Sequence, residues 1–388
     1  MRRLILFVSM TLAAVLAGPV PSGVADTAPA VTLSASPTSV TFGQTVGLTG
    51  QVTPPSGGQT IDVLDAHGGL LAQATTEADG SYSTSAEPDR NMSIHAQWGP
   101  AVSGPVDLRV RPFLTAKRSD VRLFDTTVVT GRLAPALGGS HVDVTLWTNG
   151  SPVVRARPMV LRNGTFRAEL EVDGFGTHSV VVRFHDGEHQ PVMWRSHPAR
   201  TSLPPPLHEG SRGPFVQLLE RRLAELGYQV YAQDPVFDYR DADTVMAFHK
   251  VQGMARTHVV DGATWRALAH PKSFKIVGPA TGTHWEVDLT KQVVAYVVRG
   301  RAAAIFHVSS GKPSTPTRPG TFHVWSKQPG TNSKGMYFSS FFDGNRAFHG
   351  YPDVPEYAAS HGCVRMPFWN ALWVYDHAPI GMLVIVHY

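Results

Sequence analysis

The feature that most constrains the fold is an internal repeat in the first half of the 388-residue chain. Residues 47–52 (GLTGQV) align with residues 128–133 (VVTGRL), and residues 61–63 (IDV) align with residues 142–144 (VDV), at one offset of 81 positions. In both copies, apolar and polar residues alternate along short segments that end at Asp-Gly or Asn-Gly turn signals. This pattern is typical of β-strands, so we predict two tandem β-sandwich domains.

The two predicted sandwich domains cover residues 26–111 and 112–197, and they resemble bacterial immunoglobulin-like modules. Composition favours the same fold class, because the chain holds 36 glycines and 30 prolines but only 16% charged residues. A long coiled coil or a charged disordered chain would need far more Glu, Lys and Arg. We therefore expect a multidomain, mainly β protein whose two sandwiches carry no catalytic set of residues.

Residues 1–25 have the three parts of a secretory signal peptide. Met1-Arg2-Arg3 precedes about fourteen mostly apolar residues, and a stretch of small residues ends at Ala25. We expect cleavage before Asp26 and export; an uncleaved anchor is the alternative, although about fourteen residues are fewer than the roughly 20 that span a bilayer. The formal net charge is +4 and there is no basic run, which argues against nucleic acid as a partner.

A proline-rich linker at residues 198–210 precedes a segment with helical periodicity. Three short amphipathic patterns begin at Pro214, near Asp243 and at Asp261, and they predict a small three-helix domain over residues 211–271. This sequence resembles the peptidoglycan-binding module of wall hydrolases, which implies a domain that attaches the protein to peptidoglycan. From the residues alone, a packing spacer that binds nothing stays open.

Alternating apolar segments return after the helical segment and predict a β-rich final domain over residues 280–388. Its most distinctive residue is Cys363, the one cysteine of the chain. A catalytic thiol needs a base that takes its proton and N–H donors that face the carbonyl oxygen under attack. His349 and His361 are the candidate bases, and Gly362 lets the N–H groups of Gly362 and Cys363 point into one site. A small buried apolar thiol is the alternative.

Two short segments, residues 360–365 (SHGCVR) and 348–350 (FHG), resemble the signature of the YkuD-like L,D-transpeptidase catalytic domain. Upstream, residues 308–312 (VSSGK) and 317–322 (TRPGTF) resemble the same family. The resemblance covers roughly the last quarter of the chain, and it implies a β-rich catalytic domain there.

The resemblance implies a role for five residues of the predicted active site. Cys363 corresponds to the nucleophile and His349 to its base. The ring of His349 would be oriented by the residue that follows it, here Gly350, which can offer only its carbonyl. His361 would help to form the oxyanion side, together with the main-chain N–H groups of His361, Gly362 and Cys363.

We further expect Arg365, Ser360 and Tyr337 to contact the substrate. Arg365 stands where the family has Asn or Arg, and its planar guanidinium suits a carboxylate of the substrate. One departure from the family concerns the lid over the site, because only ten residues lie between His349 and Ser360. That number is smaller than in many members, so we expect a shorter lid.

The reaction that the resemblance implies is an acyl transfer through a Cys363 thioester. The thiol attacks the third residue of a peptidoglycan stem tetrapeptide, the terminal D-Ala leaves, and an amine of a second stem forms a 3→3 cross-link. The partners would be donor and acceptor stem peptides in the cell wall, with carbapenem-type β-lactams as inhibitors and no metal or organic cofactor. Two alternatives stay open: an L,D-carboxypeptidase that uses water as acceptor, and a non-catalytic peptidoglycan-binding structural protein.

Overall fold

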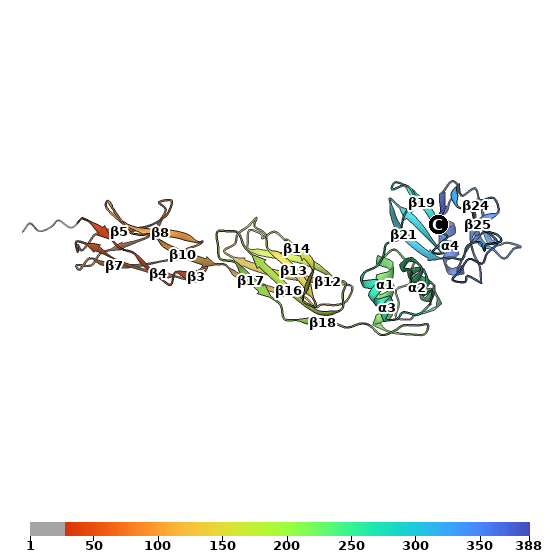
Figure 1. The fold of residues 1–388 in the computed structure, drawn as a ribbon, viewed down its shortest axis with the longest axis horizontal. Coiled ribbons are helices and arrows are strands. Elements are labelled where there is room, and N and C mark those ends of the chain that lie inside the picture. Colours follow the sequence, from red (N-terminus) through yellow and green to blue (C-terminus); the bar gives the residue numbers. More distant parts are fainter. Residues whose placement is uncertain (1–27) are drawn as a thin grey trace, which may run out of the picture. The chain divides into compact units, whose positions relative to one another are not determined.

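The computed structural model describes residues 28–388, so the predicted signal peptide and its cleavage site lie outside the described residues. Two groups of strands are followed by three helices and then by a final domain of strands with one helix (Figure 1). The protein is therefore multidomain and mainly β, as predicted. The chain divides into two compact units, one formed mainly by residues up to Leu114 and one that contains Met193–Tyr388 with most of residues 115–184.

The first sandwich consists of two sheets that share a core. One sheet contains β1 (Ala30–Val31), β2 (Ser34–Ser36), β4 (Val46–Thr53) and β7 (Ser81–Ala86). The other contains β3 (Ser39–Thr41), β5 (Thr60–Asp65), β6 (Leu70–Thr75), β8 (Met92–Trp98), β9 (Ala101–Val102) and β10 (Val106–Arg111). Leu48 of the first sheet is buried in one cluster with Ile94 and Leu108 of the second. The alternating pattern thus marks which side chains face the core.

The second sandwich repeats the two-sheet arrangement. Its smaller sheet contains β11 (Phe113–Arg118), β12 (Asp125–Ala134) and β15 (Thr165–Val172). Its larger sheet contains β13 (Asp143–Thr148), β14 (Ser151–Ala156), β16 (Gly176–Phe184), β17 (Val192–Arg195) and β18 (Ala199–Thr201). Burial alternates along β15, where Phe166, Ala168 and Leu170 are buried between exposed neighbours. This is the period of two that the sequence pattern predicts for a half-buried strand.

Three helices form the next domain: α1 (Pro214–Glu225), α2 (Tyr239–Gln252) and α3 (Gly262–Ala269). Pro214 opens α1, where a missing N–H costs no helical hydrogen bond, and Gly227 follows its end with a φ of +82°. Asp261 caps α3, because its carboxylate accepts a hydrogen bond from the N–H of Thr264 at 2.7 Å. Both predicted starts are therefore confirmed.

The predicted start of α2 near Asp243 is wrong, because the helix begins one turn earlier. Asp238 is its N-cap and accepts a hydrogen bond from the N–H of Arg240 at 2.7 Å. The Asp241 carboxylate in turn accepts from the N–H of Asp238 at 2.9 Å. This capping box satisfies N–H groups of the first turn, whereas the apolar stripe used for the prediction begins only at Val245.

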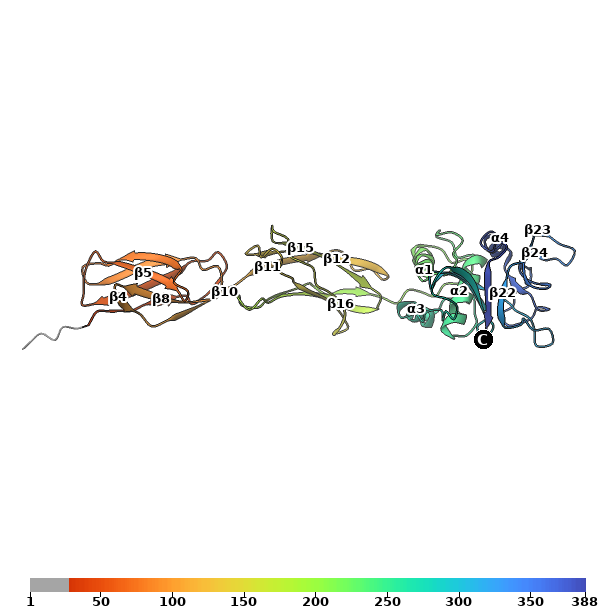
Figure 2. The same cartoon turned by 90° about the horizontal axis from the view of Figure 1, so that it is seen from above.

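The final domain contains two sheets and one helix. The first sheet, in the order β21-β20-β19-β27-β22, contains β19 (Thr283–Asp288), β20 (Val293–Val298), β21 (Arg301–His307), β22 (Gly320–His323) and β27 (Leu383–His387). The second contains β23 (Ser326–Thr331), β24 (Tyr337–Asp343), β25 (Arg346–Gly350) and β26 (Val364–Met366). Figure 2 shows the C-terminus beside β22, which pairs antiparallel with β27.

The core of the final domain joins both sheets to α4 (Phe368–Asp376). Trp285 of β19 and Phe348 of β25 are fully buried in this cluster, and Val374 of α4 joins them. The apolar residues of 366–376 recur at helical spacing and predict a helix from Met366. This start is wrong, because Met366 still belongs to β26 and the helix follows Pro367. The core therefore fixes β25 and β26 side by side.

The helical domain and the five-stranded sheet share one hydrophobic core. Phe248 of α2 and Trp265 of α3 lie in the same buried cluster as Val293 of β20 and Ile305 of β21. The Ile305 N–H also donates to the carbonyl of Gly227 at 2.8 Å. Without the helices this face of the sheet would be exposed to water, so the two domains are one packing unit.

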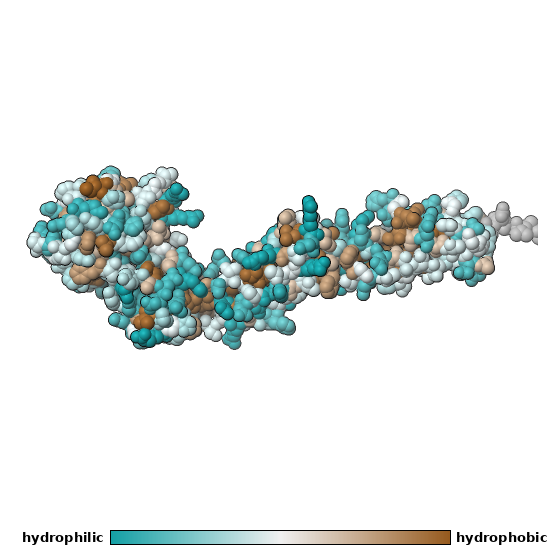
Figure 3. All heavy atoms as spheres, turned by 180° about the vertical axis from the view of Figure 1, so that it is seen from behind, coloured by the Kyte–Doolittle hydropathy of each residue, from teal (hydrophilic) through white to brown (hydrophobic). Residues whose placement is uncertain are grey.

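Apolar residues on the described surface do not form one large patch on the face in view. Leu70, Met159 and Trp325 are each more than half exposed, and they belong to three different domains. In Figure 3, hydrophobic residues are scattered among hydrophilic ones. Within residues 28–388, no helix is both long and apolar enough to cross a membrane.

Glu220→Gln should stabilise the protein at alkaline pH. Glu220 is 1% exposed on α1, and burial together with the nearby Asp241 and Asp234 raises its pKa to about 8. The folded state thus holds a proton that the unfolded state releases near the ordinary pKa, and stability falls as the pH rises from about 4.5 toward 8. Thermal unfolding should show a higher Tm for Glu220→Gln at pH 8 and little change at pH 5. An equal shift at both pH values would contradict the titration.

Candidate active site

A cavity of about 490 Å³ opens on the final domain. It is lined by the loop between β23 and β24, by β25 with the turn before it, and by the segment that carries the cysteine. The lining residues are Gln328, Asn332, Ser333, Lys334, Met336, Phe341, Asn345, His349, Tyr351, Ser360, His361, Cys363 and Arg365. Lys334 and Arg365 are cationic and none of the lining residues is acidic, so the cavity favours anionic ligands. A larger cavity beside α1 is lined by neither cysteine nor histidine.

The loop before Cys363 is held by its own side-chain and backbone hydrogen bonds. The hydroxyl of Ser360 is fully buried, donates to the carbonyl of Cys363 at 2.6 Å and accepts from the N–H of Gly362 at 3.0 Å. The hydroxyl of Thr317 donates to the carbonyl of Gly362 at 2.9 Å and accepts from the N–H of Gly311 at 2.9 Å. Ser360 therefore shapes the loop, and its hydroxyl is not available to a substrate.

The expectation that the N–H of Gly362 faces the site is wrong, because this N–H donates to Ser360 instead. Gly362 has a φ of +112°, a conformation that side chains disfavour. Within the described part of the chain, the N–H groups of His361 and Cys363 have no hydrogen-bond partner. These two N–H groups are the candidate oxyanion donors.

Gly362→Ala should slow acylation of Cys363 by at least about tenfold, since a strained residue costs about 1–3 kcal/mol. A Cβ at this position would lie 2.9 Å from Nε of Arg346, so the loop must shift. The measurement is the rate of acylation by a β-lactam, taken together with Tm. Gly381→Ala is the matched control, because Gly381 has a φ of +88° and no atom near its Cβ position. Acylation of Gly362→Ala at the wild-type rate would contradict the role of this loop.

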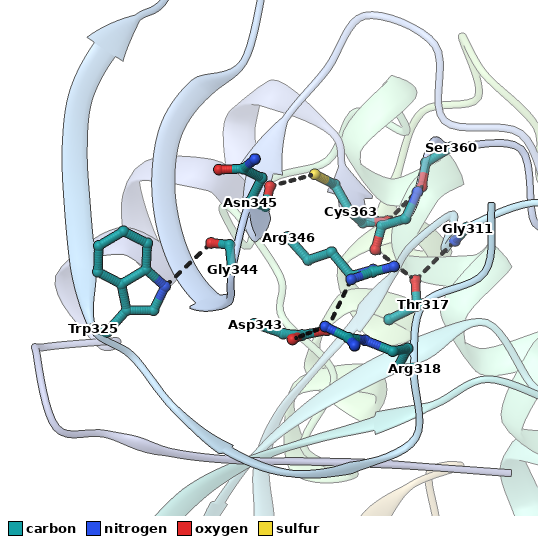
Figure 4. A network of polar contacts seen from close by, with 11 residues as sticks. Gly311, Thr317, Arg318, Trp325, Asp343, Gly344, Asn345, Arg346, Ser360 and Cys363 are labelled. Carbon is teal, nitrogen blue, oxygen red and sulfur yellow. Dashed lines mark hydrogen bonds and ion pairs between the residues drawn. The ribbon is translucent and has the colours of Figure 1, made fainter.

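Cys363 is half-buried, and its thiol points to the turn before β25 (Figure 4). The Sγ atom lies 3.6 Å from the carbonyl oxygen of Asn345. Burial raises the pKa of the thiol, while Arg365, Arg346 and Lys334 act in the opposite direction. At neutral pH the resting residue is therefore a thiol that needs a base.

His349 reaches the cavity from β25, where its backbone pairs in parallel register with Arg365 of β26. Its Nδ1 lies 2.9 Å from the carbonyl of Gly350, which can only accept, so Nδ1 carries the proton and Nε2 is left as the acceptor. The ring is 3% exposed, and burial lowers the pKa of His349 to about 4. At neutral pH the imidazole is uncharged and can take a proton.

Gly350 lies where the strand packs against α4. A Cβ there would lie 2.8 Å from Cβ of Ala371 and 3.2 Å from Cδ1 of Tyr337. The ring of Tyr337 packs edge-on against Phe368, with ring centroids 5.3 Å apart, and it is not among the cavity-lining residues. The structure therefore does not bring Tyr337 to the cavity, although it was expected to contact the substrate.

The other two expected residues, His361 and Arg365, do line the cavity. His361 is exposed, and its Nε2 lies 3.4 Å from Nζ of Lys312. The guanidinium of Arg365 lies 4.1 Å above the ring centroid of Tyr351. This cation–π contact orients the guanidinium beside Cys363.

A charged cluster under the cysteine loop was not predicted from the sequence. Asp343 accepts hydrogen bonds from Nε of Arg318 at 3.0 Å and from Nη1 of Arg346 at 3.1 Å (Figure 4). Asp343 and Arg346 flank a turn whose Asp-Gly-Asn-Arg sequence indicates only a hairpin. Arg318 comes from a distant loop, so no local pattern could have paired it with Asp343.

Two family models match the chain. Residues 282–386 match the family described as "L,D-transpeptidase catalytic domain", and residues 212–268 match the family described as "Putative peptidoglycan binding domain". These are the two domains that share a hydrophobic core. A comparison with curated proteins returned no match.

Several solved structures are similar to the chain. An L,D-transpeptidase from Xylanimonas cellulosilytica is 32% identical over 48% of this chain and 100% of that chain, with a TM-score of 0.45. A cysteine-to-serine mutant of the Enterococcus faecium L,D-transpeptidase is 27% identical over 32% of this chain and 62% of that chain, with a TM-score of 0.25. An L,D-transpeptidase from Mycobacterium tuberculosis is 20% identical over 27% of this chain and 57% of that chain, with a TM-score of 0.25.

Proposed function

Because the chain belongs to the L,D-transpeptidases, we propose that it is a cell-wall enzyme that forms 3→3 cross-links in peptidoglycan through a Cys363 thioester. The observation that carries this proposal is the common cavity of Cys363, a neutral His349 and Arg365. A thiol, a proton acceptor and a fixed cation are the groups that acyl transfer from an anionic peptide needs.

In the proposed first step, Sγ of Cys363 bonds to the carbonyl carbon of the third stem residue as its proton moves to Nε2 of His349. The carbon–nitrogen bond to the terminal D-Ala then breaks, and the proton of His349 passes to the leaving amine. In the second step, the amine of another stem attacks the thioester, gives its proton to His349 and releases the thiol. No metal or organic cofactor enters this balance.

The oxyanion of each tetrahedral intermediate would be stabilised by the N–H groups of His361 and Cys363. Both lie in the loop that Ser360 and Thr317 hold, so the donors are fixed before the substrate arrives. Arg365 would bind a stem carboxylate, since Tyr351 already orients its guanidinium.

Peptidoglycan is the proposed partner of the helical domain as well, and the two sandwiches would act as immunoglobulin-like spacers. The protein would then work outside the cytoplasm, attached to the cell wall, after export through the predicted signal peptide. β-Lactams of the carbapenem type are proposed to acylate Cys363. One of the similar solved structures is an avibactam carbamoyl enzyme.

The test is mass spectrometry of products after the full chain is incubated with disaccharide tetrapeptides. The proposal predicts dimers that have lost one D-Ala and are linked through the third residues of both stems. Tripeptide monomers alone would mean that water is the acceptor, as in a carboxypeptidase, and would overturn the cross-linking proposal. Unchanged tetrapeptides would favour a non-catalytic wall-binding protein.

A further inference from the structure

Lys250 of α2 is buried against the final domain, although no carboxylate among residues 28–388 is within hydrogen-bond distance of its amine. Its side chain is 2% exposed, and Nζ donates to the carbonyls of Gln292 and Val308 at 3.0 Å each. The third neighbour of Nζ is Nδ1 of His307 at 2.6 Å. Burial lowers the pKa of Lys250 to about 6, whereas three acceptors match the three protons of its ammonium form and offset part of the cost of burying it.

His307 links Lys250 to the segment between β25 and Cys363, which we call the lid segment. Burial, with the neighbouring Lys250, holds the pKa of His307 well below its usual range, so the ring is uncharged. Because Nδ1 accepts from Lys250, Nε2 carries the proton and donates to the carbonyl of Val354 at 2.9 Å. A residue of the helical domain thus fixes the ring that holds the lid segment.

A second path leads from Lys250 to the cysteine loop through Gln292. The carbonyl of Gln292 is bound by Lys250, and its side-chain amide accepts from the N–H of Ser310 and donates to the hydroxyl of Ser310, both at 2.7 Å. The carbonyl of Ser310 accepts from the N–H of Ser360 at 2.9 Å. The hydroxyl of Ser360 in turn donates a hydrogen bond to the carbonyl of Cys363. Every link is a direct hydrogen bond between buried or half-buried groups.

Arg256, which follows α2, makes a third connection. Its Nη1 donates to the carbonyl of Glu356 at 2.6 Å, and its Nη2 donates to the carbonyl of Thr290 at 3.1 Å. Glu356 lies two residues after Val354 in the same lid segment. The helical domain therefore holds this segment at two places, through Lys250 with His307 and through Arg256.

We propose that Lys250 is a positioning residue for the Cys363 loop, so that the helical domain is part of the catalytic unit in addition to binding the wall. The proposal rests on the proposed function where it takes Cys363 as the nucleophile. Lys250 acts through His307, Gln292 and Ser310, and it does not touch the substrate. An apolar side chain would fill the same space with a smaller loss of solvation free energy than Lys250. This difference favours a role for the three hydrogen bonds of Lys250 beyond packing.

The experiment compares the full chain with Lys250→Met by deuterium exchange and by the rate of Cys363 acylation with a carbapenem. We expect exchange in residues 354–362 to be about tenfold faster and acylation about tenfold slower, as for loss of buried hydrogen bonds. Exchange in β24 should stay unchanged. Lys272→Met is the matched control, because Nζ of Lys272 donates only to the carbonyl of Gln252, within the helical domain and its connection.

Unchanged exchange in residues 354–362, or an equal rise throughout the final domain, would overturn the proposal. If Lys250→Met does not fold, Arg256→Ala carries the test, since Arg256 is only partly buried and its loss should speed exchange around Glu356 several-fold. No change in Arg256→Ala would likewise overturn it. If the wild-type chain is not acylated, the proposed function fails, while the exchange comparison still decides the positioning role.

Discussion

Cys363→Ala should abolish cross-linking and acylation, with a loss of at least about 10⁴-fold, as for removal of the nucleophile in other acyl-transfer enzymes. No other residue in the chain can supply a thiol. The hydroxyls of Ser360 and Thr317 cannot replace it, because both are already engaged in holding the loop. The measurement is product formation from disaccharide tetrapeptides, together with the covalent mass of the protein after exposure to a carbapenem.

The fold should survive the loss of Cys363. Its Sγ makes only weak polar contacts, with the carbonyl of Asn345 at 3.6 Å and with the backbone of Ala347, so Tm should change by only a few degrees. Cys363→Ser is the companion variant, because it keeps a hydroxyl of similar size that a weakly basic His349 cannot readily deprotonate. Substantial cross-linking by a folded Cys363→Ala protein would contradict the assignment of the nucleophile.

His349→Ala should abolish acylation at neutral pH and recover part of it as the pH rises toward 9. Burial raises the pKa of the Cys363 thiol, so without a base the thiolate fraction grows tenfold with each pH unit below that pKa. In the wild-type protein the rate should instead fall only on acidification toward about 4, where His349 becomes protonated. The measurement is the pH profile of acylation between pH 4 and pH 10.

His361→Ala is the matched variant for that experiment. His361 is exposed and comes from the loop that carries the candidate oxyanion donors, so its loss should lower the rate by a similar factor at every pH. Alkaline recovery in His361→Ala and none in His349→Ala would reverse the assignment of the base.

The helices and strands could be predicted where a local signal marks them. Pro214 and Asp261 mark two helix starts, and β20 follows from an unbroken apolar run between Val293 and Val298. The start of α2 was missed because Asp238 and Asp241 cap it in a stretch without apolar periodicity. Local sequence signals can therefore predict that a helix is present and still misplace its first residue by one turn.

The candidate site was predictable to the extent that its residues lie in short motifs. His349 and Cys363 come from two such motifs, and β25 and β26 bring them to one cavity. The partner of the Gly362 N–H could not be predicted, since it depends on how Ser360 turns within the folded loop. Tyr337 was misplaced because strand alternation does not tell which face of β24 meets α4.

Long-range polar contacts were the least predictable feature. Lys250 and His307 are 57 residues apart, and Arg318 and Asp343 are 25 apart. Lys250 lies in an amphipathic helix, where a lysine normally indicates the solvent-exposed face. Only the shared core of the helical domain and the five-stranded sheet buries it.

The most direct test of the central claim is peptide-mapping mass spectrometry of the full chain after brief incubation with a disaccharide tetrapeptide and an acid quench. The account predicts a single adduct on the peptide that contains Cys363, equal in mass to the donor without its terminal D-Ala and removable by hydroxylamine. Cross-linked products without any adduct on Cys363, or an adduct on another residue, would contradict it.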